Sequence, residues 1–423
     1  MALLDTPHTV IRFLLTVGYD VGMHPHQDAL RPLFCQAAYN YSLRTVCLAS
    51  ARLPALISPP HAPRGRRPCC LQHLCTLCSS QRKAPKHNPT FSCRTSVNMP
   101  SWSALLVRLY IIWIRRSKAP YSNADKTRAL LASLYLQPEP YAPPRLASDV
   151  VVERVDVSEW PLYRVALARP SAADLSKTTS PANPRPAMLY LHGGAWIREA
   201  APAHWKFVAQ VARETGLDVL VPVYPLLPRP TATARQIVDG LIRIVRLTEQ
   251  PVVSIAGDSA GGCLALGLAQ ELRKAAPELA ARVRSLVLMS PLLDCALSHP
   301  ECLRLDKHDP WLGIEGLRVL IPYWTGGLPT THPLPSPLFG EIDQLPPVLL
   351  LCGTDDILCS DARRLSARFQ GQDGSEGVPG SFEGKDFTYV EQPGMVHVYP
   401  LLPHWEGSQA RELIMAFVLK HLD

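Results

Sequence analysis

From residue 187 to the C-terminus, short apolar runs rich in Val, Ile and Leu alternate with longer segments whose apolar residues recur at helical spacing. Runs of the first kind predict buried strands, and segments of the second kind predict helices. The predicted strands are 187–191, 218–224, 252–256, 284–289, 347–351 and 387–391. The predicted helices are 204–215, 231–248, 260–274, 360–369 and 408–421, and 291–346 is predicted to be irregular. This alternation indicates an α/β fold with a mostly parallel central sheet and helices on both faces, whose ligands bind at the carboxyl ends of the strands.

The region before this alternation has a different pattern. Residues 101–117 are apolar over little more than ten positions and are interrupted by arginine, and a second helical pattern covers 123–135. We interpret residues 99–149 as a helical cap segment over an apolar pocket. Two alternatives stay open for 101–117: an amphipathic helix on a membrane surface, or a simple packing helix. The domain that follows, at 150–423, starts with two predicted strands, 150–157 and 162–168, which favour an antiparallel pair at the edge of the sheet.

Residues 1–98 show no sustained periodicity, and their prolines would interrupt any element. The net charge of +7 is concentrated there, because residues 52–94 hold basic residues and no acidic one. Seven of the 12 cysteines also precede residue 98, and Cys75 and Cys78 have the CxxC spacing of a zinc site. Since no second knuckle follows, we favour a disordered basic, cysteine-rich tail over a metal site.

Composition narrows the partners and the compartment. Outside the basic stretch the chain is near neutral, and we expect no nucleic-acid partner. No segment reaches the roughly 20 uninterrupted apolar residues that a membrane-spanning helix needs. Without a convincing signal peptide, we expect free thiols and a cytoplasmic protein, with peripheral contact to an intracellular membrane through 101–117 as the alternative.

The sequence GDSAGG follows the predicted strand 252–256 and precedes the predicted helix 260–274. Its Gly257-Asp258-Ser259-Ala260-Gly261 portion fits GxSxG, in which glycines allow a strand and a helix to approach closely around a serine on a strained turn. A helix that starts beneath Ser259 also points its amide dipoles at developing negative charge. The pattern indicates a nucleophilic serine, although a GxSxG match alone is a weak signal.

A second motif, HGGAW, follows the predicted strand 187–191. Two consecutive glycines at a strand end allow backbone N–H groups to turn outward together, as an oxyanion hole requires. An ordinary tight turn would have the same sequence, but the presence of GDSAGG further along the chain favours the functional interpretation. We assign the oxyanion donors to the amides of Gly193, Gly194 and Ala260.

A serine nucleophile needs a base and a carboxylate that orients the base, and both should follow later strands. Asp355 and Asp356 come after the predicted strand 347–351, and His397 comes in the loop after the strand 387–391. His397 is therefore the predicted base. At this point the pattern leaves both aspartates as candidates for the acid.

These motifs together resemble the hormone-sensitive-lipase-like esterases, also called the α/β-hydrolase fold-3 family. The resemblance rests on HGGAW, YPLLP at 224–228, GDSAGG, SPLLD at 290–294, DxL at 356–358 and GMVH at 394–397. It implies that Asp356 is the acid and that N-terminal helices form the cap. The sequence departs from the family pattern at Ala195, where a third glycine is usual. We expect activity to survive that change.

The sequence predicts a serine hydrolase that cleaves carboxylic esters, with lactones as a further substrate class, through an acyl-enzyme intermediate. Ser259, Asp356 and His397 are the predicted triad, and Trp196, Tyr224 and Trp311 are the predicted substrate contacts. We expect a small-molecule ester or lactone as the partner and neither a metal nor an organic cofactor. The alternatives are an amidase or formamidase with the same triad and a non-catalytic ligand receptor on the same fold.

Overall fold

A computed structural model of the chain describes residues 99–168, 184–374 and 376–422. The expected disordered basic, cysteine-rich tail at 1–98 lies outside these described residues, and so does the disfavoured alternative, a zinc site at Cys75 and Cys78.

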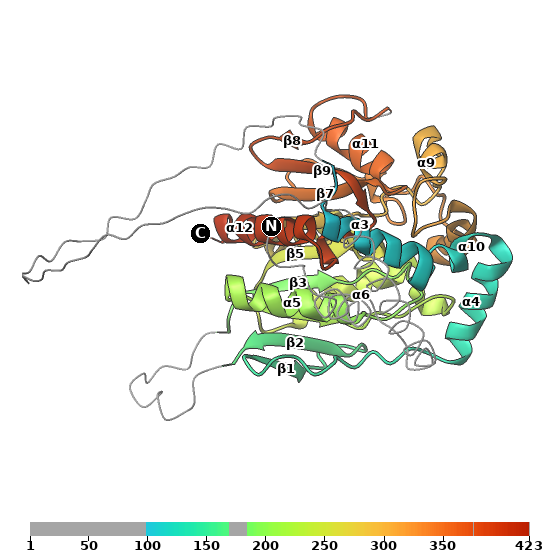
Figure 1. Cartoon of the computed structure of the whole chain (residues 1–423). Coiled ribbons are helices and arrows are strands. Elements are labelled where there is room, and N and C mark those ends of the chain that lie inside the picture. Colours follow the sequence, from blue (N-terminus) through green and yellow to red (C-terminus); the bar gives the residue numbers. More distant parts are fainter. Residues whose placement is uncertain (1–98, 169–183, 375, 423) are drawn as a thin grey trace, which may run out of the picture. The chain divides into compact units, whose positions relative to one another are not determined.

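A nine-stranded sheet forms the centre of this structure, with the strand order β1-β2-β4-β3-β5-β6-β7-β9-β8 (Figure 1). Its inner strands pair in parallel, whereas β1 with β2, β2 with β4, and β8 with β9 pair antiparallel. The mostly parallel sheet and its antiparallel edge pair are therefore confirmed. The strands are β1 (Val150–Arg154), β2 (Leu162–Leu167), β3 (Ala187–Leu191), β4 (Asp218–Pro222), β5 (Val252–Asp258), β6 (Ser285–Met289), β7 (Val348–Asp355), β8 (Phe382–Glu383) and β9 (Phe387–Val396).

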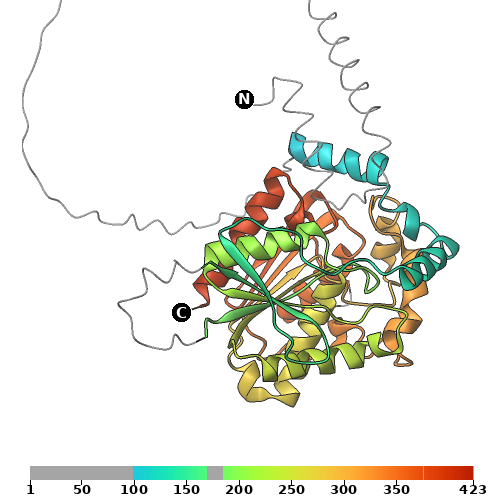
Figure 2. The same ribbon diagram turned by 90° about the horizontal axis from the view of Figure 1, so that it is seen from below.

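Helices cover both faces of the sheet, as predicted. The helices are α3 (Trp102–Leu109), α4 (Ala124–Leu136), α5 (Pro202–Thr215), α6 (Ala234–Leu247), α7 (Ala260–Ala275), α8 (Pro277–Ala280), α9 (Pro300–Leu305), α10 (Ile314–Thr325), α11 (Cys359–Phe369) and α12 (Trp405–Lys420). Figure 2 shows α5 and α6 on opposite sides of the sheet. In β3, Met188 and Tyr190 belong to the apolar core under α5 and α12, while Leu189 and Leu191 belong to the core under α6 and α7. This alternation follows from the two-residue period of a strand.

The prediction of irregular structure for 291–346 is wrong, because this region contains α9 and α10. Helix α10 has Pro322 in its interior, and a proline at such a position argues against a helix when only the sequence pattern is considered. Tertiary packing outweighs that effect: a side chain at Gly316 would lie 2.4 Å from the Tyr121 carbonyl oxygen, so α10 packs closely against the start of α4. Figure 1 shows α4 and α10 side by side.

Within the predicted cap segment, 99–149, the structure has its helices between residues 100 and 136. From here on the name cap segment refers to residues 100–136. After α3 the backbone forms a π-helical turn, Tyr110–Arg115, and then a short 3₁₀ turn at Ala119–Tyr121 before α4. Polar contacts attach the segment to distant parts of the chain. The Ser101 amide and hydroxyl donate to Glu406, Arg108 forms an ion pair with Asp355, and Lys118 donates to the Asp309 carbonyl at 3.1 Å.

Candidate active site

Ser259 lies in a sharp turn between β5 and α7, with φ 53° and ψ −121°. This left-handed conformation is rare for a residue with a side chain and is typical of a nucleophile elbow. The flanking glycines are required by close approach. A Cβ atom at Gly257 would lie 2.3 Å from the Gly261 carbonyl oxygen, and one at Gly261 would lie 2.0 Å from the Leu191 carbonyl oxygen. The turn therefore presents Ser259 at the carboxyl end of the sheet.

Two hydrogen bonds connect Ser259, His397 and Asp356. The Ser259 Oγ lies 2.9 Å from His397 Nε2, and His397 Nδ1 lies 2.8 Å from Asp356 Oδ2. The three residues follow β5, β7 and β9, so the sheet topology brings together positions that are far apart in the sequence. His397 and Asp356 are buried. This is the arrangement that a serine, a general base and an orienting carboxylate need.

The electrostatic environment favours the protonated imidazole of His397. Burial works in the opposite direction, but the Asp356 carboxylate raises the pKa of His397 above its ordinary value of 6.5, with a smaller contribution from Asp309. A base with such a pKa can accept the Ser259 proton, because the Asp356 carboxylate stabilises the imidazolium that forms.

The neighbouring aspartates have separate contacts. Asp356 accepts a hydrogen bond from the Leu358 amide as well as facing His397, whereas Asp355 pairs with Arg108 of the cap segment. Asp309, in the loop before α10, accepts from the Ile357 amide at 2.9 Å. Burial and the nearby Asp356 raise the pKa of Asp309 to about 6. The loop that contains Asp356 is therefore held by Asp309 on the Ile357 amide and by Arg108 on Asp355.

The predicted oxyanion residues do not all have free amides. The Gly193 amide donates to Asp258 Oδ1 at 3.0 Å, so this donor is already engaged. Gly194 follows with φ 119°, and Ala260 is the first residue of α7, directly after Ser259. Of the three predicted donors, Gly194 and Ala260 are the ones left to face an oxygen next to Ser259.

Asp258 organises the turn that contains Gly193. It is buried and accepts a hydrogen bond from the Tyr190 hydroxyl at 2.6 Å, and His204 Nε2 lies 3.3 Å from its other oxygen. Burial alone would raise the pKa of Asp258, but His204 and the Tyr190 hydroxyl hold it below the ordinary value. Sequence reasoning missed this role, because its signal is a Tyr in β3 and a His in α5 that become neighbours only in the folded chain.

The three predicted substrate contacts have different surroundings. Trp196 is buried and stacks on Trp324, with the ring centroids 4.2 Å apart. Tyr224 is buried too, and its hydroxyl donates to the His192 carbonyl oxygen at 2.6 Å. Only Trp311 lies beside the triad: its ring meets the His397 ring edge-on, with centroids 6.0 Å apart. Trp196 and Tyr224 therefore support the loop that contains Gly193, and Trp311 is the aromatic neighbour of the candidate base.

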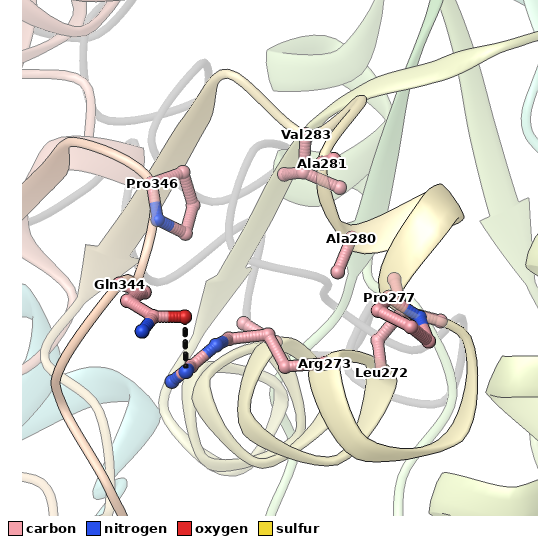
Figure 3. Close-up of a pocket in the computed structure, with 9 residues that line it drawn as sticks. Leu272, Arg273, Pro277, Ala280, Ala281, Val283, Gln344 and Pro346 are labelled. Carbon is pink, nitrogen blue, oxygen red and sulfur yellow. Dashed lines mark hydrogen bonds between the residues drawn. The ribbon is translucent and has the colours of Figure 1, made fainter.

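A surface pocket elsewhere on the molecule is not part of this site. It lies between α7, α8 and the loop before β7, with Arg273, Pro277 and Pro346 among its lining residues (Figure 3). Arg273 is near the C-terminal end of α7, whereas Ser259 precedes its N-terminal end. At about 1.5 Å per helical residue, the pocket is roughly 20 Å from Ser259.

A family model described as the α/β-hydrolase fold matches residues 188–401. The chain belongs to the α/β-hydrolase fold family. Its family membership and the resemblance to hormone-sensitive-lipase-like esterases, predicted from the motifs, are thereby confirmed.

Curated relatives of this α/β-hydrolase include an esterase and an acetyl-hydrolase. An esterase of Acinetobacter venetianus is 34% identical over 191 residues, which are 44% of this chain and 62% of that one. An acetyl-hydrolase of Streptomyces hygroscopicus is 32% identical over 242 residues, which are 55% of this chain and 74% of that one. The match thus spans less than two thirds of the first relative.

A solved structure supports the fold of the α/β-hydrolase domain. A structure described as an esterase from the bacterial hormone-sensitive lipase family superposes with a TM-score of 0.55 and 24% identity, covering 77% of this chain and 100% of that one.

Proposed function

We propose that this α/β-hydrolase is a serine hydrolase that cleaves carboxylic esters. The observation that carries the proposal is the continuous hydrogen-bonded chain from Ser259 through His397 to Asp356 at three strand ends. The esterase and acetyl-hydrolase relatives support the reaction class. The HGG turn beside Ser259 adds donors for the negative charge that ester cleavage develops.

In the proposed reaction, His397 Nε2 takes the hydroxyl proton of Ser259 as its oxygen attacks the ester carbonyl carbon. Asp356 holds the imidazole with Nδ1 protonated and stabilises the cation that forms. The carbonyl oxygen becomes an oxyanion, which the amides of Gly194 and Ala260 stabilise. His397 then returns the proton to the departing alcohol, and Ser259 is left acylated.

A water molecule completes the cycle. His397 takes a proton from the water as it attacks the acyl carbon, the same two amides stabilise the second oxyanion, and Ser259 leaves with the proton. The acid product is released. Asp258 contributes by keeping the Gly193 end of the turn in place, since it accepts from the Gly193 amide.

The alternatives differ in what they expect of His397. A non-catalytic receptor has no use for a histidine within 2.9 Å of the serine hydroxyl, so the geometry favours an enzyme. An amidase or formamidase would use the same triad, and a lactone would undergo the same attack. A panel of p-nitrophenyl esters, lactones and N-formyl amides of graded acyl length ranks these substrate classes.

The decisive test replaces the nucleophile. Ser259→Ala should lower kcat for p-nitrophenyl butyrate by about 10⁴-fold or more and should abolish labelling by a fluorophosphonate. Ser254→Ala is a matched control, because Ser254 is buried in β5, the strand that leads to Ser259, and bonds to Ser285 instead of His397. Turnover by Ser259→Ala at the wild-type rate would reject the mechanism.

Peripheral membrane contact is a second proposal, for the cap segment. Five large apolar side chains of α3 and the π-helical turn are exposed at helical spacing, and we call them the apolar stripe: Trp102, Leu105, Leu109, Ile112 and Trp113. Tryptophan and aliphatic residues on one face of a helix favour a lipid interface. Among the described residues, no helix is long and apolar enough to cross a bilayer.

A further inference from the structure

Arg115 is the last residue of the π-helical turn in the cap segment. Its guanidinium carbon lies 4.7 Å from the centre of the Trp311 ring, and that ring is the aromatic neighbour of His397. Two successive contacts therefore connect Arg115 to the candidate base. π-Helical turns are rare and are frequent at functional sites, because they displace side chains from the positions an α-helix would give them.

Arg115 is also close enough to Arg198, which follows the HGG turn, for the two charges to interact. Arg198 donates its amide to the Gly194 carbonyl oxygen, and its positive charge is close enough to disfavour the protonated form of Arg115. Trp311 is thus next to the candidate base, and Arg198 follows the HGG turn in the chain. Arg115 is therefore one aromatic ring away from His397 and is also close to the residue that follows the HGG turn.

Three nearby cations have anionic partners. Arg108 pairs with Asp355, Lys118 pairs with Asp306 and Arg198 pairs with Glu139. Within the part of the chain that the structure describes, the Arg115 guanidinium contacts Trp311 and makes no side-chain hydrogen bond or ion pair. A guanidinium has five N–H donors in a planar fork that matches a carboxylate, and Arg115 leaves them unused.

The carboxylate near Arg115, Glu139, forms its ion pair with Arg198. Burial lowers the pKa of Arg115 to about 10; Tyr110 opposes this effect, Arg198 adds to it, and Tyr121 and Glu139 oppose it more weakly. Glu139, the carboxylate of this group, already pairs with Arg198 and accepts the Glu199 amide. A bound anion would supply the missing charge and accept the free donors.

We propose that Arg115 binds an acidic group of the substrate, so that the preferred substrates are esters that also carry a carboxylate. This inference rests on the proposed ester hydrolysis and names its substrate class. The guanidinium would hold the carboxylate in a bidentate contact, while Trp311 keeps the plane of the guanidinium fixed by stacking. The ester carbonyl then reaches Ser259 with its acidic end toward the cap segment.

The test compares acidic esters with neutral amides of the same shape. One pair, para-acetoxybenzoate and para-acetoxybenzamide, carries the acid on the alcohol side, and the other, monoethyl adipate and the ethyl ester of adipamic acid, carries it on the acyl side. For the wild-type chain, kcat/KM should be higher for the acidic member of at least one pair. Arg115→Met should lower this acid-to-amide ratio by about tenfold to a hundredfold, mainly through KM, because a charged hydrogen bond is lost.

Arg116→Met is the matched control, since Arg116 is the next residue, is exposed and has the same charge. It should leave the ratio within twofold of the wild-type value, whereas Arg115→Lys should restore part of the ratio. A ratio that Arg115→Met leaves unchanged in both pairs, or a wild-type ratio of one in both, would overturn the inference. An equal fall for acidic and neutral members would overturn it too, because Arg115 would then only support Trp311.

A binding measurement separates this inference from the proposed reaction. Calorimetry of para-hydroxybenzoate with the full-length Ser259→Ala chain needs no turnover, and adding Arg115→Lys should weaken binding by about fivefold or more. Absence of hydrolysis together with Arg115-dependent binding would reject the ester hydrolase alone. Hydrolysis of both neutral esters with binding that ignores Arg115 would reject the acidic-substrate inference alone.

Discussion

The candidate site and the cap segment are built in opposite ways. Ser259, Asp356 and His397 each follow a buried strand, and hydrogen bonds connect them. The cap segment instead exposes much of its apolar surface, with Trp102 79% and Trp113 72% exposed, and scattered polar contacts attach it to the domain. We infer that the strand ends hold the candidate triad in place and that the cap segment, whose ion pair with Asp355 is partly exposed, influences which molecules reach it.

Substitutions at two adjacent residues, Asp356 of the candidate site and Asp355 beside the cap segment, should differ most in their effect on kcat. Asp356 faces His397, while Asp355 faces Arg108 of the cap segment. Asp356→Asn should lower kcat by about 10⁴-fold, because an amide no longer holds the reactive tautomer of the imidazole. Asp355→Asn should cost less than about tenfold, since a partly exposed ion pair contributes little.

Steady-state kinetics of both variants with p-nitrophenyl butyrate checks this prediction, with circular dichroism to confirm that each is folded. A larger loss for Asp355→Asn than for Asp356→Asn would move the orienting role to the other carboxylate. Equal losses would mean that the cap contact matters to the reaction as much as the triad does.

The glycines of the nucleophile turn should tolerate less change than a glycine elsewhere in the same helix. A methyl group at Gly261 would overlap the Leu191 carbonyl oxygen, whereas one at Gly267 would make contacts of 3.9 Å and longer. Gly261→Ala should therefore lower the free energy of unfolding by about 3 kcal/mol or more. Gly267→Ala should raise it by up to about 1 kcal/mol, since alanine favours the helix interior. Urea unfolding measures both, and similar values would contradict the packing argument.

The strand ends could be predicted because local pattern and topology agree there. The strand before HGGAW was predicted with the bounds that β3 has, 187–191. Once strands alternate with helices, parallel pairing places their carboxyl ends at one edge, so Ser259, Asp356 and His397 had to be neighbours. Selecting Asp356 over Asp355 needed the family resemblance, since adjacent residues share the strand end.

What the sequence could not predict depends on contacts between distant segments. The bond from Gly193 to Asp258, which removes one predicted oxyanion donor, follows from the way β3 lies beside β5. Similarly, Trp196 follows the HGG turn in sequence, but its ring stacks on Trp324 of α10. The sequence pattern did not predict this helix, because Pro322 lies inside it. Only packing therefore shows whether a residue near the site in sequence supports a loop, as Trp196 does, or lies beside the triad, as Trp311 does.

Titration of the candidate base should set the activity at low pH. The pKa of His397 is raised above 6.5, so the imidazole gains a proton as pH falls through that higher value and can no longer accept one from Ser259. Below its pKa, kcat/KM should fall about tenfold per pH unit. The profile with a neutral ester should show a midpoint above 6.5, and a midpoint near 4 would point to a carboxylate as the limiting group.

The apolar stripe should matter for lipid contact and little for folding. Because Trp102 and Trp113 are largely exposed, replacing both by serine should change the free energy of unfolding by about 0.5 kcal/mol or less. The same change should reduce flotation with phospholipid vesicles several-fold. Leu247→Ser is the control, since Leu247 is an exposed apolar residue at the end of α6, outside the stripe. Equal flotation of all three chains would remove the membrane proposal.

The smallest effect is expected from removing residues 1–98, which we propose are not part of the catalytic domain. The cap segment is attached to the domain from its first residues: Pro100 fits against Gly394, and the Ser101 amide and hydroxyl donate to Glu406 at 2.6 and 2.8 Å. A chain that starts at Met99 keeps these contacts, so it should unfold at the same urea concentration and hydrolyse p-nitrophenyl butyrate within twofold of the full-length rate. A chain that starts at Asn123 loses the α3 contacts and Arg115 as well, and it should be less stable. If the Met99 chain were as impaired as the Asn123 chain, the boundary at residue 98 would be misplaced, because the cap segment would then depend on residues before it.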